Sequence, residues 1–212
     1  MASERLVRGD DGVRRCGWAA SAPEYVAYHD RDWGRAVVDG TKIYEKLCLE
    51  GFQAGLSWLT ILRKRDNFRR AFEGFDPETV ARFGRRDVER LMRDPGIVRN
   101  RAKINAAIDN ARATLALEAQ SESLAELCWS FEPPARSRRA PRTFADVPAV
   151  TAESKALSKR LLAAGFRFVG PTTVYAAMQS LGIVNDHFVG CALRADAERQ
   201  RAATRRPGTT VR

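Results

Sequence analysis

Apolar residues recur every three or four positions along most of this chain, which is the spacing that gathers them on one face of an α-helix. Residues 57–72, SWLTILRKRDNFRRAF, place Trp58, Ile61 and Phe68 along one stripe, with Ser57 in position to cap the helix. The same spacing is found in residues 41–50, 76–84, 86–94, 101–117, 153–165 and 171–182. The pattern therefore predicts an all-α fold.

Residues that start and stop helices stand at the ends of these stretches. Thr41 and Asp76 are suitable N-caps, and Pro77 and Pro171 fall at first helical positions, where a missing backbone N–H is tolerated. Gly165 is suited to the left-handed conformation that ends a helix. These residues favour separate helices joined by short turns.

The helical pattern outlines one domain with less regular ends. We expect a single helical domain over residues 15–193, interrupted by an exposed Pro- and Arg-rich loop at 132–142. Residues 1–14 are expected to form a flexible extension, and residues 194–212 a basic, disordered tail. The strand signal is confined to residues 166–170, FRFVG.

The length and composition fit one large globular core. The chain has 212 residues, of which 44% are apolar. No apolar run approaches the length of a membrane span, and the first residues lack the apolar segment of a secretory signal. We therefore expect a cytoplasmic protein without a membrane partner, and nothing in the sequence requires more than a monomer.

The formal charge of +10 is unevenly distributed along the chain. Residues 133–142 and residues 194–212 each carry a net charge of +4, whereas residues 16–132 and 143–193 together are almost neutral. Most of the excess thus lies in the predicted loop and tail. There it is compatible with a polyanionic partner, but equally with a solubilising role alone.

Both histidines of the chain stand near a cysteine, which suggests a metal site. Cys16 and His29 are close to the N-terminus, and His187 and Cys191 lie one helical turn apart near the other end. Structural zinc takes four such ligands in a tetrahedron. The alternative is that the histidines are hydrogen-bonded residues of the core or surface, and spacing alone does not decide between the two.

A closed set of two cysteines and two histidines leaves no vacant position on a zinc ion, so we expect Zn²⁺ to join the two ends of the domain and take no part in catalysis. Cys48 and Cys128 lie in apolar helical contexts and are interpreted as small buried residues.

Glu50 occupies a position where an apolar residue is expected, because it shares a helical face with Ile43 and Leu47. A buried carboxylate requires hydrogen-bond donors. A pocket with aromatic walls and this single acceptor would suit a flat, electron-poor or cationic heterocycle. The alternatives are a solvated glutamate at a helix end and aromatic residues that only pack in the core. The aromatic residues just upstream are Trp18, Tyr25, Tyr28 and Trp33.

Residues 93–103, RDPGIVRNRAK, have the pattern of a helix-hairpin-helix element. Backbone amides of such a hairpin, around Gly96, bind a DNA phosphate without reading sequence, and Arg99, Arg101 and Lys103 would add positive charge. The spacing alone favours the other interpretation, an ordinary turn between two helices on a solvated face.

Taken together, the motifs resemble those of a known family, the zinc-containing bacterial 3-methyladenine DNA glycosylases of type I. The similarity extends over residues 15–191, in the order expected for that family. The motifs that carry it are RCGW, YVAYHDRDWG, LCLEGFQAGLSWLTIL, DPGIVRNRAKI and FVGPTTVYAAMQSLGIVNDHFVGC.

The resemblance implies a helix-hairpin-helix glycosylase fold, with zinc held by the four residues proposed above. It also implies roles for the other motif residues. Glu50 would be the catalytic acid of the base pocket, and Trp58 its stacking ring. The remaining base-binding residues would be Trp18, Tyr25 and Tyr28. The DNA-binding residues would be Gln53, Gly55 and Leu56 in the loop that enters the duplex, and Gly96, Arg99, Arg101 and Lys103 in the hairpin.

The implied activity is hydrolytic excision of 3-methyladenine from double-stranded alkylated DNA, with the free base and an abasic site as products. No lysine is expected in the pocket, so Schiff-base lyase chemistry is not expected. Two other interpretations remain open at this stage. One is a DNA-binding module that recognises distorted duplex without catalysis, and the other is a glycosylase for a different damaged base, such as an alkylated or oxidised guanine.

Overall fold

The computed structural model describes residues 5–208 and confirms the all-α prediction. The helices in this part of the chain are α1 Pro23–Arg31, α2 Gly40–Gln53, α3 Trp58–Ala71, α4 Pro77–Ala81, α5 Arg85–Arg93, α6 Arg101–Glu118, α7 Leu124–Trp129, α8 Ala152–Ala163, α9 Pro171–Ser180 and α10 Arg194–Ala203. Short 3-10 helices are η1 Gly17–Ser21, η2 Glu73–Phe75, η3 Ala135–Ser137 and η4 Phe144–Asp146.

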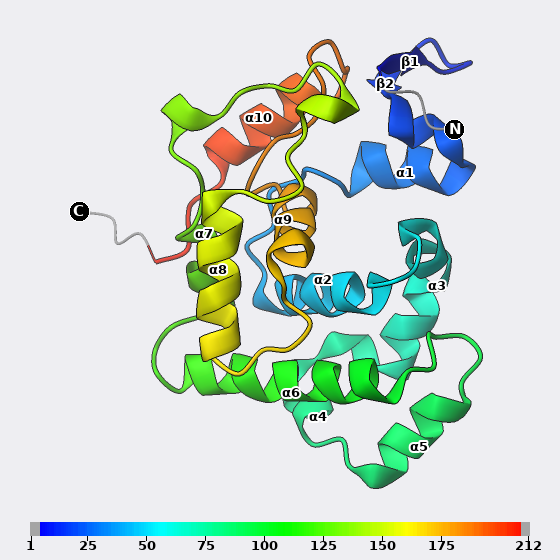
Figure 1. The fold of residues 1–212 in the computed structure, drawn as a ribbon, viewed down its shortest axis with the longest axis vertical. Helices are drawn as coiled ribbons and strands as arrows, with labels where there is room; N and C mark the ends of the chain where they lie inside the picture. The colour runs from blue at the N-terminus through cyan, green and yellow to red at the C-terminus, as the bar shows by residue number, and fades with distance from the viewer. Residues whose placement is uncertain (1–4, 209–212) are drawn as a thin grey trace.

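Helix α2 lies at the centre of the molecule and packs against α3, α6, α7 and α9 (Figure 1). Its buried face includes Ile43, Leu47 and Phe52, which join one large apolar core. Most of the chain after α2 contributes to this core, from α3 through α9. The functional cavity described below opens beside the C-terminal part of α2.

Several predicted helix boundaries are confirmed by capping contacts. The side chains of Ser57 and Asp76 accept hydrogen bonds from the backbone amides three residues later, as N-caps do. Gly165 has a left-handed φ of 95° directly after α8. The N-cap predicted at Thr41 is wrong: the helix begins at Gly40, because Asp39 supplies the capping oxygen to the amide of Lys42.

The strand prediction is wrong in position. Residues 166–170 form no strand, whereas Leu6–Arg8 (β1) and Arg14–Cys16 (β2) pair antiparallel, with Leu6 opposite Cys16. Part of the predicted flexible extension is therefore an ordered hairpin. Leu6 packs against the small apolar cluster formed by Cys16, Phe188 and Cys191.

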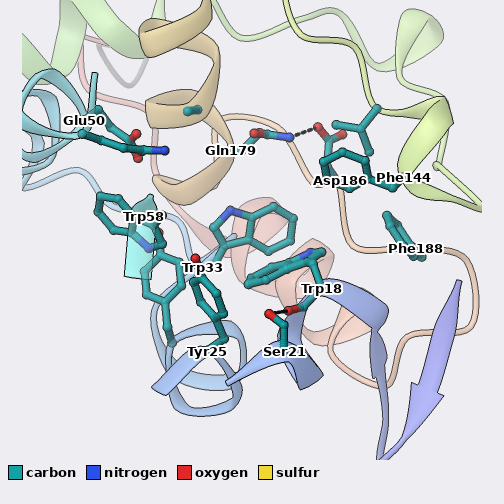
Figure 2. A pocket seen from close by; sticks show the side chains of 14 residues that line it. Trp18, Ser21, Tyr25, Trp33, Glu50, Trp58, Phe144, Gln179, Asp186 and Phe188 are labelled. Carbon is teal, nitrogen blue, oxygen red and sulfur yellow. Dashed lines mark hydrogen bonds between the residues drawn. The ribbon is translucent and has the colours of Figure 1, made fainter. Parts of the chain in front are cut away.

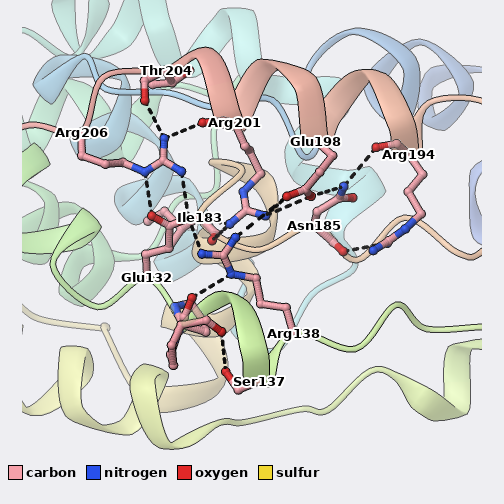
Figure 3. A network of polar contacts seen from close by, with 12 residues as sticks. Glu132, Ser137, Arg138, Ile183, Asn185, Arg194, Glu198, Arg201, Thr204 and Arg206 are labelled. Carbon is pink, nitrogen blue, oxygen red and sulfur yellow. Dashed lines mark hydrogen bonds and ion pairs between the residues drawn. The ribbon is translucent and has the colours of Figure 1, made fainter.

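The prediction of a disordered tail from residue 194 also differs from the structure, because residues 194–203 form α10. Arg201 on this helix is 1% exposed, and its guanidinium donates to Glu132 at 2.7 Å and to the carbonyl of Ile183 at 2.9 Å (Figure 3). Glu132 also forms ion pairs with Arg138 and Arg206. The last four residues of the predicted tail, 209–212, lie outside the described residues.

Within residues 5–208, no helix combines the length and the apolar character that crossing a bilayer would require.

Candidate functional site

A cavity of about 630 Å³ opens between the N-terminal segment, α2, α3 and α9 (Figure 2). Its walls are mainly aromatic, with a few polar side chains at its two ends. The lining residues are Trp18, Ser21, Tyr25, Tyr28, Trp33, Glu50, Gln53, Trp58, Phe144, Val147, Ala176, Gln179, Asp186 and Phe188. The cavity thus brings together all five residues that the sequence assigned to base binding.

The aromatic rings form a continuous wall. The Trp58 and Tyr28 ring centroids are 5.5 Å apart, and Trp18 lies 6.4 Å from Tyr28. Tyr25 meets the edge of Trp18 at 5.8 Å, and Trp33 does so at 5.1 Å. Such a wall offers ring faces and edges to a flat ligand.

Glu50 lies at one end of this wall and is only 6% exposed. The apolar face of α2 carries it inward, since it follows Leu47 by three residues on a helix whose flanking positions are all buried. The alternative of a solvated glutamate at a helix end is therefore excluded by its burial. Its Oε1 lies 2.7 Å from the ammonium of Lys46, one turn earlier on α2.

Lys46 is a residue of this site that the sequence interpretation missed. Its ammonium donates to the Tyr28 hydroxyl at 2.9 Å and lies 3.6 Å from the centroid of the Trp58 ring. Burial alone would lower the pKa of Lys46, but the charge of Glu50 and the hydrogen bonds to Glu50 and Tyr28 outweigh it and raise that pKa. The available signal was the four-residue spacing to Glu50, which is usually typical of surface ion pairs.

A second polar group stands at the opposite end of the cavity. Gln179 on α9 donates to Asp186 at 2.8 Å (Figure 2). The Tyr175 hydroxyl donates to the same carboxylate oxygen at 2.7 Å. The negative charge of Asp186, together with burial, raises the pKa of Tyr175. The sequence interpretation did not single out any of these three residues.

The loop after α2 reaches the surface next to the cavity. Gln53 lines the cavity itself, Gly55 has a left-handed φ of 80°, and the Leu56 side chain is 44% exposed. A side chain would be strained at that φ, which explains the glycine. This exposed apolar side chain, three residues after Gln53, is compatible with the duplex-entering loop that the sequence resemblance implies.

Helices α5 and α6 are joined by a short turn around Gly96, whose amide donates to Asp94 at 2.7 Å. Arg99 is exposed on this turn. Arg101 is also exposed, and pairs with Glu89 at 3.0 Å. The element has the order of a helix-hairpin-helix and presents basic side chains to solvent.

Lys103 departs from the expected position on this surface. It is 8% exposed, and its ammonium donates to the carbonyls of Phe52 at 2.8 Å and of Ala54 at 2.5 Å. Burial lowers its pKa. Because α6 turns this residue inward, towards the end of α2, Lys103 holds the Gln53–Leu56 loop and does not extend the basic surface of the hairpin.

The four residues of the predicted metal site converge at the junction of the N- and C-terminal segments. Cys16, His29, His187 and Cys191 are all buried, and their ligand atoms lie within 4.8 Å of one another. His187 Nδ1 is 3.2 Å from His29 Nε2, and Cys191 Sγ is 3.6 Å from each of these nitrogens. Bonds of about 2.0–2.3 Å to a tetrahedral zinc ion separate its ligand atoms by roughly 3.3–3.8 Å, so the residues present fit such an ion.

The two thiols of this cluster differ in their affinity for a proton. Contact with Cys191 and burial raise the pKa of the Cys16 thiol, whereas the hydrogen bond from Cys16 and those from the histidines lower the pKa of Cys191. Burial lowers the pKa of His187, and a neutral imidazole is the form that binds a metal. The site therefore already favours one thiolate.

A second layer of contacts orients the ligands. His29 Nδ1 is 2.8 Å from the carboxylate of Asp30. The same carboxylate forms an ion pair with Arg15 at 2.7 Å. The amide of Phe188 donates to Cys16 Sγ at 3.2 Å. Carboxylates behind histidine ligands and amides donated to thiolates are common supports of metal centres.

Gly34 allows the chain to pass close to this cluster. It has a left-handed φ of 75°, and a Cβ at this position would lie 2.9 Å from His187 Nε2. A larger residue would therefore displace the imidazole.

Comparison with known proteins places these features in one family. The family model described as methyladenine glycosylase matches residues 18–195. The chain is 49% identical over 179 residues to DNA-3-methyladenine glycosylase 1 of Escherichia coli K12, covering 84% of this chain and 96% of that protein. It is 44% identical to the DNA-3-methyladenine glycosylase of Haemophilus influenzae, again with 84% and 96% coverage.

Among solved structures, the chain is similar to 3-methyladenine DNA glycosylase I of Staphylococcus aureus, whose structure addresses recognition of 3-methyladenine. The TM-score is 0.80 at 34% identity, and the match covers 85% of this chain and 96% of that one.

Proposed function

The chain belongs to the methyladenine glycosylase family, and on that premise we propose that it excises 3-methyladenine from alkylated DNA. The reaction is hydrolysis of the N-glycosidic bond, which releases the free base and leaves an abasic site for base excision repair. The observation that carries this proposal is a buried carboxylate, Glu50, at the end of a cavity walled by aromatic rings.

In the proposed complex the damaged nucleotide leaves the duplex and its base enters the cavity. Trp58 and Tyr28 stack on the base, and Trp18 and Tyr25 complete the aromatic lining. Methylation at N3 gives adenine a positive charge, which strengthens its attraction to the negative faces of aromatic rings. Glu50 accepts a hydrogen bond from the exocyclic amino group of the base.

The chemistry then requires little help, because a cationic base is already a good leaving group. The bond between the base and C1′ breaks, and its electron pair goes to the base, which departs neutral. Water adds its oxygen to C1′ and loses a proton to solvent. Glu50 takes part by holding the base, so its role is to bind and orient the leaving group.

The charge state of Lys46 agrees with attack on C1′ by water and not by a lysine amine. A Schiff base requires a neutral amine, and the contacts of Lys46 with Glu50 and Tyr28 raise its pKa and keep it protonated. We therefore expect base release without strand cleavage.

Discrimination between bases is proposed to depend on the hydrogen-bond pattern. Guanine carries a carbonyl where adenine carries an amine, and that carbonyl would face the Glu50 carboxylate as one acceptor opposite another. A buried mismatch of this kind costs about 1–3 kcal/mol. 3-Methyladenine is thus preferred over 3-methylguanine.

We propose that Cys16, His29, His187 and Cys191 hold one Zn²⁺ ion. A closed set of four protein ligands leaves no position for water, so the ion would contribute a structural cross-link. The residues themselves connect β2 and α1, which carry Cys16 and His29, with the segment before α10, which carries His187 and Cys191.

DNA contact is proposed at two elements on the same side of the molecule as the end of α2. Leu56, supported by Gln53 and Gly55, would fill the space left by the flipped nucleotide. The turn around Gly96 would bind a phosphate through its backbone, with Arg99 and Arg101 adding charge. We expect the protein to act as a monomer in the bacterial cytoplasm.

A base-release assay tests this function. Methylated duplex DNA is incubated with the protein, and the freed bases are separated by chromatography. Release of 3-methyladenine is expected. Release of another damaged base in its place would indicate a different glycosylase, and binding of the DNA without release of any base would indicate a non-catalytic DNA-binding module.

A further inference from the structure

Lys46 is enclosed by the same residues that are proposed to bind the damaged base. Its ammonium has three protons and three acceptors around it: Glu50 Oε1 at 2.7 Å, the Tyr28 hydroxyl at 2.9 Å and the Trp58 ring at 3.6 Å. A lysine whose donors are all satisfied within a binding site is fixed in position, unlike a lysine in solvent.

This ammonium is the positive partner of the Glu50 carboxylate. It is 6% exposed, and Lys46 is the one cation paired with it among residues 5–208. A buried carboxylate without a positive partner becomes neutral, because burial penalises the charged form. A protonated Glu50 would turn one of its oxygens into a donor and would no longer be a strong acceptor.

The pairing uses one of the two carboxylate oxygens. Oε1 meets Lys46, whereas no hydrogen bond to Oε2 is found in residues 5–208. That oxygen is therefore available to a ligand in the cavity.

We propose that Lys46 is a positioning residue of the base pocket, whose ammonium keeps Glu50 ionised and holds its Oε1, so that Oε2 is left to accept from the amino group of the flipped base. This inference rests on the proposed excision of 3-methyladenine. Lys46 acts through Glu50 and is not itself placed in contact with the reacting atoms.

Within residues 5–208, no further ion pair is formed by Lys46 or Glu50. Helix α1 contributes Tyr28, α3 contributes the uncharged Trp58, and α9 contributes the uncharged Ser180, whose hydroxyl donates to the carbonyl of Ala177. Burial raises the pKa of Tyr28, so it stays neutral below pH 10. Among these groups, Glu50 is thus the one that loses its charged partner when Lys46 is replaced.

The test is the pH dependence of excision by the variant Lys46→Met, which keeps the length of the side chain and removes its charge. Single-turnover rates of 3-methyladenine release are measured between pH 6 and pH 8. We expect Lys46→Met to approach the wild-type rate at pH 8 and to fall about 10-fold or more below it at pH 6, since an unpaired buried carboxyl titrates several pH units higher. Equal profiles for the two proteins would overturn the proposal.

Control variants separate this role from a structural one. Lys46→Arg keeps the charge and should restore the wild-type profile, and Lys42→Met, an exposed lysine one turn earlier on α2, should leave it unchanged. The double variant Lys46→Met with Glu50→Gln should show no pH dependence beyond that of Glu50→Gln alone. A loss of equal size at every pH would assign Lys46 a packing role and contradict the proposal.

Should Lys46→Met fail to fold, Lys46→Gln provides the same comparison with a neutral donor. Its rate of 3-methyladenine release should fall at low pH, as expected for Lys46→Met. A pH dependence equal to that of the wild type would equally overturn the proposal. Failure of the proposed function is distinguishable from these outcomes, because wild-type protein would then release no 3-methyladenine at any pH.

Discussion

At the scale of single residues, the floor of the cavity is a paired charge and not a free anion. Glu50 and Lys46 lie 2.7 Å apart, so their formal charges largely cancel for a ligand a few ångströms away. The sequence motifs predicted only the carboxylate. Selection of a cationic base therefore depends on ring stacking and on one oriented acceptor, more than on net charge.

The first prediction concerns that acceptor. Glu50→Gln keeps the shape of the side chain but removes the charge from the hydrogen bond to the base. Hydrogen bonds to charged groups contribute about 1.5–3 kcal/mol, so we expect single-turnover excision of 3-methyladenine to fall about 10- to 100-fold.

Glu45→Gln is the matched control for this experiment. Glu45 is on the same helix but pairs with Arg69 at 2.9 Å, outside the cavity, so its loss should leave excision unchanged. Because Glu50→Gln leaves the buried ammonium of Lys46 without its partner, its melting temperature should fall, and excision is measured at a temperature at which both proteins are folded. Excision by Glu50→Gln at the wild-type rate would remove Glu50 from the proposed mechanism.

At the scale of elements, α6 and the end of α2 are linked by Lys103. Its ammonium donates to the carbonyls of Phe52 and Ala54, where α2 ends and would otherwise leave acceptors unpaired. The hairpin before α6 and the loop after α2 are therefore held in a fixed relation, and both belong to the proposed DNA-binding surface.

The second prediction follows from this link. Lys103→Met should lower the free energy of unfolding by about 2–3 kcal/mol, because two carbonyls lose a charged donor. Arg99→Ala should instead leave stability unchanged. The slope of log affinity for DNA against log salt concentration should become smaller by about 1, the value for one lost phosphate contact. Denaturant unfolding and DNA affinity at several salt concentrations distinguish them. If Lys103→Met were as stable as the wild type and its DNA affinity depended less on salt concentration, Lys103 would instead contact a DNA phosphate, as first expected.

Elements with strong local signals were predictable from the sequence, and elements that depend on distant partners were not. Helix α3 has an apolar stripe and a capping serine, and α9 begins at Pro171, so local pattern was sufficient. Helix α10 has few apolar residues. It is instead anchored by Arg201, whose partner Glu132 is 69 residues away in sequence. No periodicity could reveal that pairing.

The candidate site shows the same division. The four metal-binding candidates were identifiable because the chain has only two histidines, each near a cysteine. Lys46 was not, since its spacing from Glu50 is equally typical of a solvent-exposed pair. Only the burial of both residues, which requires the packing of α1 and α3 over α2, shows that this pair is internal.

At the scale of the whole molecule, the metal site joins segments about 160 residues apart in sequence, as in the pair His29 and His187. The third prediction is that purified protein contains one equivalent of zinc and that its removal by a chelator lowers the melting temperature by roughly 10 °C. Cys16→Ser should lose the zinc, whereas Cys48→Ala, which alters an equally buried cysteine, should retain it. Identical melting curves with and without chelator would contradict a structural metal.

The net charge of +10 is less available to DNA than the sequence suggests. Three arginines from the predicted loop and tail, Arg138, Arg201 and Arg206, converge on Glu132 (Figure 3). Their charge is used to attach α10 and the segment around 132–142 to the rest of the protein. We therefore expect these three arginines to contribute less to DNA affinity than their formal charge suggests.

The last prediction tests this attachment through Glu132→Gln. Burial alone would raise the pKa of Glu132, but the hydrogen bond and charge of Arg206, together with Arg138 and Arg201, lower it overall. A carboxyl with a lowered pKa stabilises the folded state at neutral pH, and that contribution is lost as the pH falls below the ordinary range of about 4.3. We expect Glu132→Gln to lose about 3 kcal/mol of unfolding free energy at pH 7, because it leaves the buried Arg201 short of negative charge. The difference from the wild type should shrink in acid.

Glu122→Gln, which breaks the exposed pair with Arg160, should cost less than about 1 kcal/mol. Equal stabilities of Glu132→Gln and the wild type at pH 7 would show that α10 is held by packing alone.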